Sequence, residues 1–439
     1  MRVFDRFLEP PANASPTERH NFRVAFRESA FIGFIAAGST FLPVFIARLG
    51  GSNLQVSLIS ALPSLTGVML AIPLGGLIQT RRNIIPWYSR GRLGNQLGYV
   101  AIAVAAFLLP AQYVVPGILA VWAVVTVFSV VTSVSFAVVM DATAGGTGRY
   151  ELMSRRWSIL GVMNALSLVL VGQALGWMPF PTNYEVIFVG LGLLGLISFR
   201  YSRAIRVPDH PPSPRGGGGP RFASISDLVA RVRTQPAFLA FASRHFLYAI
   251  GAAIAVPLVP LFYVRVIGAP DAWIGIIGTT QALMLLVGYA VWRRASRRRG
   301  SRFVLTWAAI GAAATPAALA LTRDVAVAAA IAGIGAVFAA GVNLAIFDRM
   351  MTIVPKGYGV TFTSVDTSVV YAAGIIGPLL AAVLADHLGV PAALGVASIA
   401  SLIGALLFAI DRSPAAPVGV PVDRPAAAAP VAGREEVTG

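Results

Sequence analysis

Long apolar runs separated by short polar stretches recur along the whole chain. A helix needs about 20 mostly apolar residues to cross a bilayer core of about 30 Å. The runs predict twelve spans at 29–48, 54–78, 93–115, 117–140, 157–178, 183–202, 237–264, 272–292, 303–321, 325–347, 360–386 and 391–410. The narrow breaks at 115–117 and 321–325 predict two tight hairpins. We therefore expect an all-α integral membrane protein with twelve transmembrane helices.

The positive charge is distributed unevenly over the predicted loops. Of the 34 Lys and Arg residues, 30 lie in the two termini and in alternate loops, and three lie in the opposite loops. Arg and Lys concentrate in the cytoplasmic loops of membrane proteins. The first 22 residues lack the apolar stretch of a signal peptide. We expect a multi-pass protein of the bacterial plasma (inner) membrane with both termini in the cytoplasm.

The densest basic segment, 292–302, reads WRRASRRRGSR. Clustered arginines can indicate a nucleic-acid site. Here, however, the segment joins two predicted spans, which places it beside the anionic headgroups of the bilayer. We expect the lipid bilayer as its partner, and no nucleic acid.

The composition limits the chemistry that the chain can perform. It is 56% hydrophobic and 12% charged, has no cysteine, and has four scattered histidines. Neither paired histidines, clustered carboxylates nor a Walker glycine loop is present in the sequence. We expect no cofactor, no metal and no catalytic residue, so the chain is not expected to be an enzyme.

A linker divides the chain into two similar halves. The segment 206–224, RVPDHPPSPRGGGGPRFAS, has the composition of a flexible linker. The expected organisation is an N-terminal cytoplasmic segment, a six-helix bundle, a cytoplasmic linker, a second six-helix bundle and a disordered tail. These parts cover 1–22, 23–205, 206–233, 234–411 and 412–439, respectively.

Repeated motifs support the division. Pro43, Phe45 and Arg48 of LPVFIARLGG match Pro260, Phe262 and Arg265 of VPLFYVRVIG at one constant offset. Asn53 and Asp271 then follow as expected N-caps of the next spans. Parallel six-span repeats are the arrangement of the major facilitator transporters.

At this point the chain resembles the major facilitator superfamily over residues 20–411. Two stretches, NFRVAFRESAFIGFIAAGSTFLPVFIARLGG and DATAGGTGRYELMSRRWSILG, are similar to a group of uncharacterised bacterial members. The family signature between spans 2 and 3 lacks its aspartate, because Gln79 or Thr80 stands there; Arg90, Gly91 and Arg92 supply its basic end.

The resemblance implies two pseudo-symmetric halves and a substrate site near the bilayer midplane between them. Mid-span polar and aromatic residues are the candidates for binding: Phe34, Ser60, Ser129, Thr132, Asn164, Tyr248, Gln281, Asn343 and Tyr371. The alternative is that these side chains pack helices or bond their own backbone. Without a mid-bilayer carboxylate, the substrate is expected to be neutral or lipophilic.

Charged residues near span ends are the candidates for gating. Asp141 and Asp348 are expected to close the cytoplasmic face with loop arginines such as Arg90 and Arg92, and Glu28 could pair with Arg244 across the halves. Arg244 has a second interpretation, as an arginine that extends to the headgroups.

Three functions remain open. The first is a secondary transporter of a small molecule, acting as a monomer, with efflux as one direction of transport. The second is a non-transporting sensor or partner protein that retains the fold. The third is a membrane-embedded enzyme.

Overall fold

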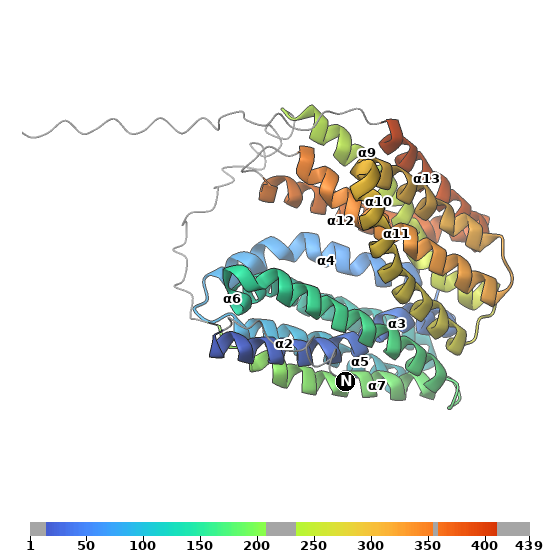
Figure 1. The fold of residues 1–439 in the computed structure, drawn as a ribbon. Helices are drawn as coiled ribbons and strands as arrows, with labels where there is room; N and C mark the ends of the chain where they lie inside the picture. Colours follow the sequence, from blue (N-terminus) through green and yellow to red (C-terminus); the bar gives the residue numbers. More distant parts are fainter. Residues whose placement is uncertain (1–14, 208–233, 354–358, 411–439) are drawn as a thin grey trace, which may run out of the picture.

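The computed structural model describes residues 15–207, 234–353 and 359–410, and every regular element in these ranges is a helix (Figure 1). The first half contains α2 (Pro16–Ile35), α3 (Ala37–Arg48), α4 (Asn53–Gln79), α5 (Ile85–Leu108), α6 (Ala111–Ala174) and α7 (Thr182–Arg203). The second half contains α9 (Pro236–Leu261), the π-helical turn η1 (Phe262–Val266), α10 (Asp271–Ala320), α11 (Val325–Ile353), α12 (Gly359–Leu388) and α13 (Val390–Ile410). The expected linker and C-terminal tail lie almost wholly outside the described residues.

Ten segments of the described chain are long and apolar enough to cross a membrane. They include two within α6, Ala111–Met140 and Leu152–Ala174, and the single 50-residue segment Asp271–Ala320. That segment covers two expected spans and turns at Gly300, whose positive φ of 82° suits glycine alone. The remaining expected span, α5, is not among the ten. The all-α membrane fold is confirmed, whereas the count of twelve is confirmed only in part.

The first span begins earlier than predicted. A capping box between Ser15 and Glu18 starts α2 at Pro16, well before residue 29. The chain breaks at Ala36 and continues as α3 to Arg48. The polar first turns hid this start, because they carry no apolar run.

The predicted hairpin at 115–117 is wrong, and the one at 321–325 is confirmed. The break before α6 lies at Leu109 and Pro110 instead. Proline cannot donate a helical hydrogen bond and disfavours helical geometry in the residue before it; Leu109 is extended. The preceding helix starts at Ile85, so Arg90 and Arg92 lie in α5 and not in a loop.

The expected N-caps are also wrong. Ser52 caps α4 in a capping box with Gln55, and Pro270 precedes α10 without a side-chain cap. Asn53 and Asp271 are the first helical residues of α4 and α10. Their side chains are therefore available for contacts outside their own helices.

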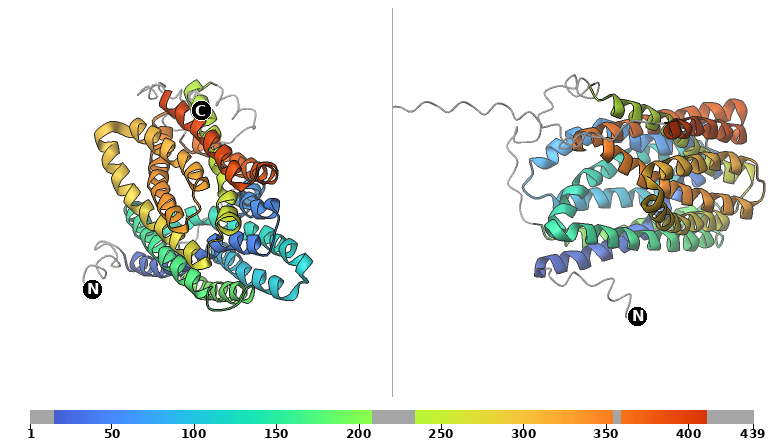
Figure 2. Two further views of the ribbon diagram at one scale, coloured as in Figure 1. Left: turned by 90° about the vertical axis from the view of Figure 1, so that its right-hand side faces the viewer. Right: turned by 45° about the horizontal axis from the view of Figure 1, so that its top comes forward.

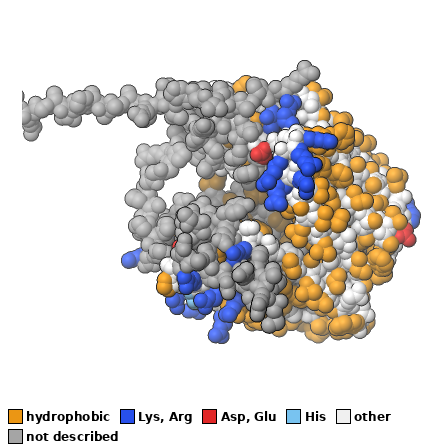
Figure 3. Space-filling model, viewed as in Figure 1, with side chains coloured by type: hydrophobic (Ala, Val, Ile, Leu, Met, Phe, Trp, Pro, Cys, Tyr) orange, Lys and Arg blue, Asp and Glu red, His pale blue; other side chains and the backbone are white. Residues whose placement is uncertain are grey.

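The two halves lie side by side with their helices roughly parallel (Figures 1 and 2). Across the boundary, α10 packs on α6 and α12 packs on α4. We call the end where the described chain stops at Val207 and resumes at Thr234 the linker end, on the left of Figure 1. Hydrophobic side chains dominate the right-hand part of the face in Figure 3, and basic side chains gather towards the linker end. This surface is the one expected of a protein that faces lipid.

A close contact between the halves brings together two glycines. A Cβ atom on Gly275 of α10 would lie 2.4 Å from the carbonyl oxygen of Leu168 and 3.1 Å from Cα of Gly172, both in α6. These are backbone atoms, which cannot move aside as a flexible side chain can. Only glycine lets the two helices approach this closely, as at other small-residue contacts in membranes.

We therefore expect Gly275→Ala to lower the thermal unfolding midpoint of the purified protein, because overpacking costs about 1–3 kcal/mol. The matched control is Gly190→Ala in α7, where an added Cβ meets no atom within 4 Å. Alanine is the better helix former, so the control should be neutral or stabilising. Equal midpoints for Gly275→Ala and the wild type would contradict this interpretation of the contact.

Candidate functional site

Arg48, at the end of α3, joins the two halves at the end opposite the linker. Its guanidinium donates from Nε to Oδ1 of Asp271 at 2.9 Å and from Nη2 to the carbonyl oxygen of Ala269 at 2.8 Å. The hydroxyl of the buried Tyr184, in α7, donates to the same carboxylate oxygen at 2.5 Å. One carboxylate of the second half thus accepts from two donors of the first.

A second set of contacts repeats this arrangement with the halves exchanged. Arg265, in η1, donates to Oδ1 of Asn53 at 2.7 Å and to the carbonyl oxygen of Gly51. The amide of Asn53 then donates to Oδ1 of Asp386, in α12, at 2.7 Å. Arg48 corresponds to Arg265 in the repeat, so the two sets are related by the pseudo-symmetry of the halves.

We call the six side chains Arg48, Asn53, Tyr184, Arg265, Asp271 and Asp386 the latch, and the end of the molecule that carries them the latch end. Two features of the sequence point to it. Arg48 and Arg265 are two of the three basic residues in the loops that the sequence predicts for this end, and they occupy equivalent positions in the repeat. The partners were missed because Asn53 and Asp271 were assigned to helix capping.

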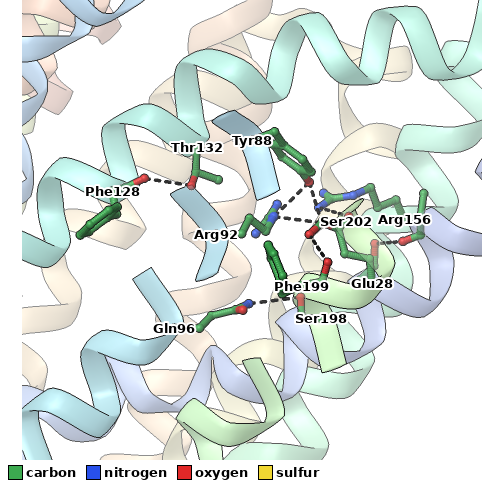
Figure 4. A network of polar contacts seen from close by, with 12 residues as sticks. Glu28, Tyr88, Arg92, Gln96, Phe128, Thr132, Arg156, Ser198, Phe199 and Ser202 are labelled. Carbon is green, nitrogen blue, oxygen red and sulfur yellow. Dashed lines mark hydrogen bonds and ion pairs between the residues drawn. The ribbon is translucent and has the colours of Figure 1, made fainter. Parts of the chain in front are cut away.

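A buried ionic cluster lies inside the first half, towards the linker end (Figure 4). Glu28, fully buried on α2, accepts from the hydroxyl of Tyr88 at 2.8 Å and pairs with Nε of Arg92 at 3.1 Å. Arg156 of α6, 1% exposed, lies 3.9 Å from the other carboxylate oxygen. The cluster joins α2, α5 and the second part of α6.

Two guanidinium groups share this one carboxylate. Arg92 also lies over the ring of Tyr88 at 5.0 Å, and Arg156 lies over the ring of Phe136 at 4.7 Å. Ring faces attract cations, which offsets part of the cost of burying the second arginine. The sequence alone placed Arg92 and Arg156 in loops, because an arginine near a span end is normally solvated.

These contacts change the expected gating pairs. Glu28 pairs with Arg92 within its own half, and the Glu28–Arg244 pair is absent from the ion pairs of the described residues. The pairing across the halves is therefore wrong for this conformation. Arg90 and Asp348 are exposed near the linker end. The side chain of Asp141 lies outside the described ones, and its role remains a prediction.

A cavity of about 1040 Å³ lies between the halves. Its walls come from α3, the second part of α6, α9, α10 and α11. The polar groups on them are hydroxyls and amides, including Thr40, Ser158, Asn164, Tyr248, Gln281 and Thr315. The lining includes no Asp, Glu, Lys, Arg or His. Oδ1 of Asn164 is buried without a hydrogen-bond partner in the described structure, so it is available to a ligand.

Three of the nine predicted binding residues, Asn164, Tyr248 and Gln281, line this cavity. Asn343 is 3.5 Å from the hydroxyl of Tyr289, which is itself a lining residue. The other five, Phe34, Ser60, Ser129, Thr132 and Tyr371, are not in its lining.

Two of those five bond to their own helix. Ser129 donates to the carbonyl of Val125 and Thr132 donates to that of Phe128. Tyr371 instead packs on Gly67 across the boundary between α4 and α12, where a Cβ added to the glycine would come within 3.1 Å of its ring. Hydropathy identifies mid-span polar residues, but it does not show which face of the helix they occupy.

The fold is that of known membrane transporters. A bacterial homologue of the human lysosomal transporter Spinster, in an inward-facing and unoccupied conformation, aligns with a TM-score of 0.65 at 14% identity, covering 91% of this chain and 97% of that one. A bacterial metal transporter aligns with a TM-score of 0.65 at 14% identity, covering 90% and 98%. A mutant of the peptide transporter POT, in complex with sulfate, aligns with a TM-score of 0.64 at 14% identity, covering 88% and 92%.

The sequence provides an independent result. The Major Facilitator Superfamily model matches residues 245–436, which lie in the second half and the tail. A comparison with curated proteins returned no match. The class is therefore a multi-pass helical membrane protein with a transporter fold. The second half thus matches the model of the major facilitator superfamily, and the fold of the described chain is similar to that of solved transporters.

Proposed function

We propose that this chain is a secondary transporter that moves a neutral or lipophilic small molecule by alternating access. The observation that carries the proposal is the cavity between the halves, which has no charged side chain in its lining. Sites of this kind lie between the two repeats of such transporters and open to each side in turn. The latch supports the mechanism, because it holds the halves together at one end through contacts that must break for that end to open.

The lining favours a neutral substrate over an ion. A charged ligand in a water-poor site needs a partner of opposite charge, and the lining offers amides, hydroxyls and aromatic rings instead. Asn164 and Gln281 can donate and accept, whereas Trp157 and Tyr248 offer apolar faces. The structural neighbours carry different names, a metal transporter and a peptide transporter among them, so the fold alone does not select the cargo.

The orientation follows from the arginines. The linker end faces the cytoplasm of a bacterial cell, where the arginine run of α10 contacts anionic headgroups. The latch end then faces outward, and the conformation with the latch formed is closed to the outside. The protein resides in the plasma membrane as a monomer with both termini in the cytoplasm, and efflux is the direction that suits a lipophilic cargo.

Uptake of a labelled compound library into proteoliposomes tests the proposal. Time-dependent accumulation of at least one neutral compound, absent from protein-free liposomes, is the expected result. If the protein transports no compound in either orientation, the transporter assignment fails and a sensor that retains the fold is favoured. If the protein converts a lipid or a solute chemically without net flux, an enzyme is favoured.

Gln281→Leu should lower transport of the identified compound by about tenfold, because losing one buried hydrogen bond costs about 1.4 kcal/mol, a tenfold change in affinity. The matched control is Gln173→Leu, an exposed residue of α6 outside the cavity lining. The affinity for the compound, measured from the concentration dependence of uptake, separates the two variants. Equal losses in both would remove Gln281 from the site.

A further inference from the structure

The second half contains a buried pair of titratable side chains that neither the cavity nor the latch uses. Nδ1 of His245, in α9, lies 2.7 Å from Oδ1 of Asp366, in α12. The two residues are 6% and 8% exposed. A buried histidine in contact with a carboxylate can hold either one or two protons within the pair, and histidine is the side chain that titrates near neutral pH.

His245 occupies a position in the second half that is equivalent to that of Glu28 in the first half. The offset that relates Arg48 to Arg265 also relates Glu28 to His245. In the first half this position carries a carboxylate held by two arginines, whose guanidinium groups do not deprotonate in proteins. In the second half the same position carries a group that can gain and lose a proton. The fixed cluster and the titratable pair thus occupy equivalent places in the two halves.

Both helices of the pair also reach the surfaces that must move during transport. Tyr248, one helical turn from His245 on α9, lines the cavity. Further along α12 from Asp366, Gly374 faces Ser64 of α4 so closely that an added Cβ would lie 2.4 Å from its hydroxyl oxygen. A change in the distance between α9 and α12 would therefore displace side chains both in the cavity wall and at the boundary between the halves.

The charged and titratable groups on the neighbouring elements are few. The helices α4 and α13 carry none. Of the others, α3 carries Arg48, held by Asp271, and η1 carries Tyr263 and Arg265 in or near the latch. Three helices carry groups at the same end of the molecule as the pair. On α9, Arg244 is next to His245; α11 carries Asp348 and the buried Arg349; and α10 carries Tyr289 and the arginine run. The helix α12 itself also carries Tyr371, Asp386 and His387. No ion pair to His245 or Asp366 other than their own is formed among the described residues.

We infer that the His245–Asp366 pair binds the proton whose movement is coupled to transport. A water molecule on one side donates the proton, the imidazole and carboxylate hold it, and water on the other side accepts it. Only N–H and O–H bonds form and break. The charge of the pair changes from −1 to 0 on proton uptake, which lowers the cost of burying it. This inference rests on the proposed transport function.

A conformational measurement tests the site without a substrate. The chain has no cysteine, so spin labels at Trp177→Cys and Leu321→Cys report the separation of the halves at the latch end; both positions are at least 80% exposed. Between about pH 8 and pH 5, the range in which histidine titrates, the wild-type distance distribution should shift. His245→Gln and Asp366→Asn should each abolish the shift. His387→Gln, an exposed histidine of α12, should retain it.

Flux measurements complete the test in proteoliposomes, with the compound from the library and a pH-sensitive dye inside the vesicles. The expected result is proton movement that accompanies transport, with about a tenfold concentration ratio per proton for each pH unit of gradient. Either variant should transport the compound without proton movement.

Two results for the wild type would overturn the inference and leave the transport function intact. One is equal transport with and without a pH gradient, and the other is a latch-end distance that does not change with pH. Variants that keep the wild-type pH response also overturn it. A wild type with no substrate flux overturns the proposed function, while its pH-dependent distances still decide whether the proton site exists.

Discussion

Replacing Glu28 by Gln should destabilise the protein strongly. The substitution keeps the size of the side chain but leaves Arg92 and Arg156 buried without their carboxylate. Removing one partner of a buried ion pair costs about 3–5 kcal/mol, because the remaining charge is poorly solvated. The thermal unfolding midpoint of the purified protein in detergent should fall by several degrees.

Two further variants show whether charge is the cause. Glu185→Gln removes a partly exposed carboxylate from the first turn of α7 and should leave the midpoint nearly unchanged. Glu28→Gln combined with Arg156→Gln removes one charge of each sign and should recover part of the loss. If the double variant is less stable than Glu28→Gln alone, the buried charge is not the cause.

Replacing Asp271 by Asn should open the latch end. Asp271 accepts from Arg48 and Tyr184, so its carboxylate supports two contacts between the halves. Hydrogen bonds to a charged group contribute about 1.5–3 kcal/mol; the side chain of Arg48 is 25% exposed, and solvent screening lowers that value. We expect about a tenfold shift from the closed to the open population, which corresponds to about 1.4 kcal/mol. The measurement is the spin-label distance between positions 177 and 321.

The control for this experiment is Asp324→Asn at the same end. Asp324 accepts from the backbone of Val327 as a helix cap, and Asn can do the same. The spin-label distance distribution of the Asp324→Asn variant should equal that of the wild type. Exchanging the partners, as Arg48→Asp with Asp271→Arg, should restore part of the closed population. An unchanged distribution in Asp271→Asn would show that the latch is incidental to closure.

Sequence reasoning succeeded for properties that depend on the average composition of a segment. The apolar runs and the unequal arginine count led to the membrane, the two halves and the repeat, since these depend on composition averaged over about 20 residues. Asn164, Tyr248 and Gln281, which line the cavity, were singled out because a polar or aromatic side chain in the middle of an apolar run is itself a local signal. That they bind a substrate stays a prediction. Glu28 was also singled out as a residue that pairs, but with Arg244 as its partner and not with Arg92 and Arg156.

What the sequence determined by itself is therefore the class of protein: an all-α membrane protein with a repeated six-helix unit and few places for polar chemistry. Only the tertiary structure decided which residues meet. Glu28 has its partners on α5 and α6 in its own half, Asp271 contacts Arg48 across 223 positions of the chain, and His245 contacts Asp366 across 121. The physical reason is that hydropathy follows the solvent around each segment, whereas an ion pair depends on which faces of distant helices are turned towards one another. That rotation is set by packing contacts, such as those of Gly275 on α6, and packing is a property of the assembled bundle.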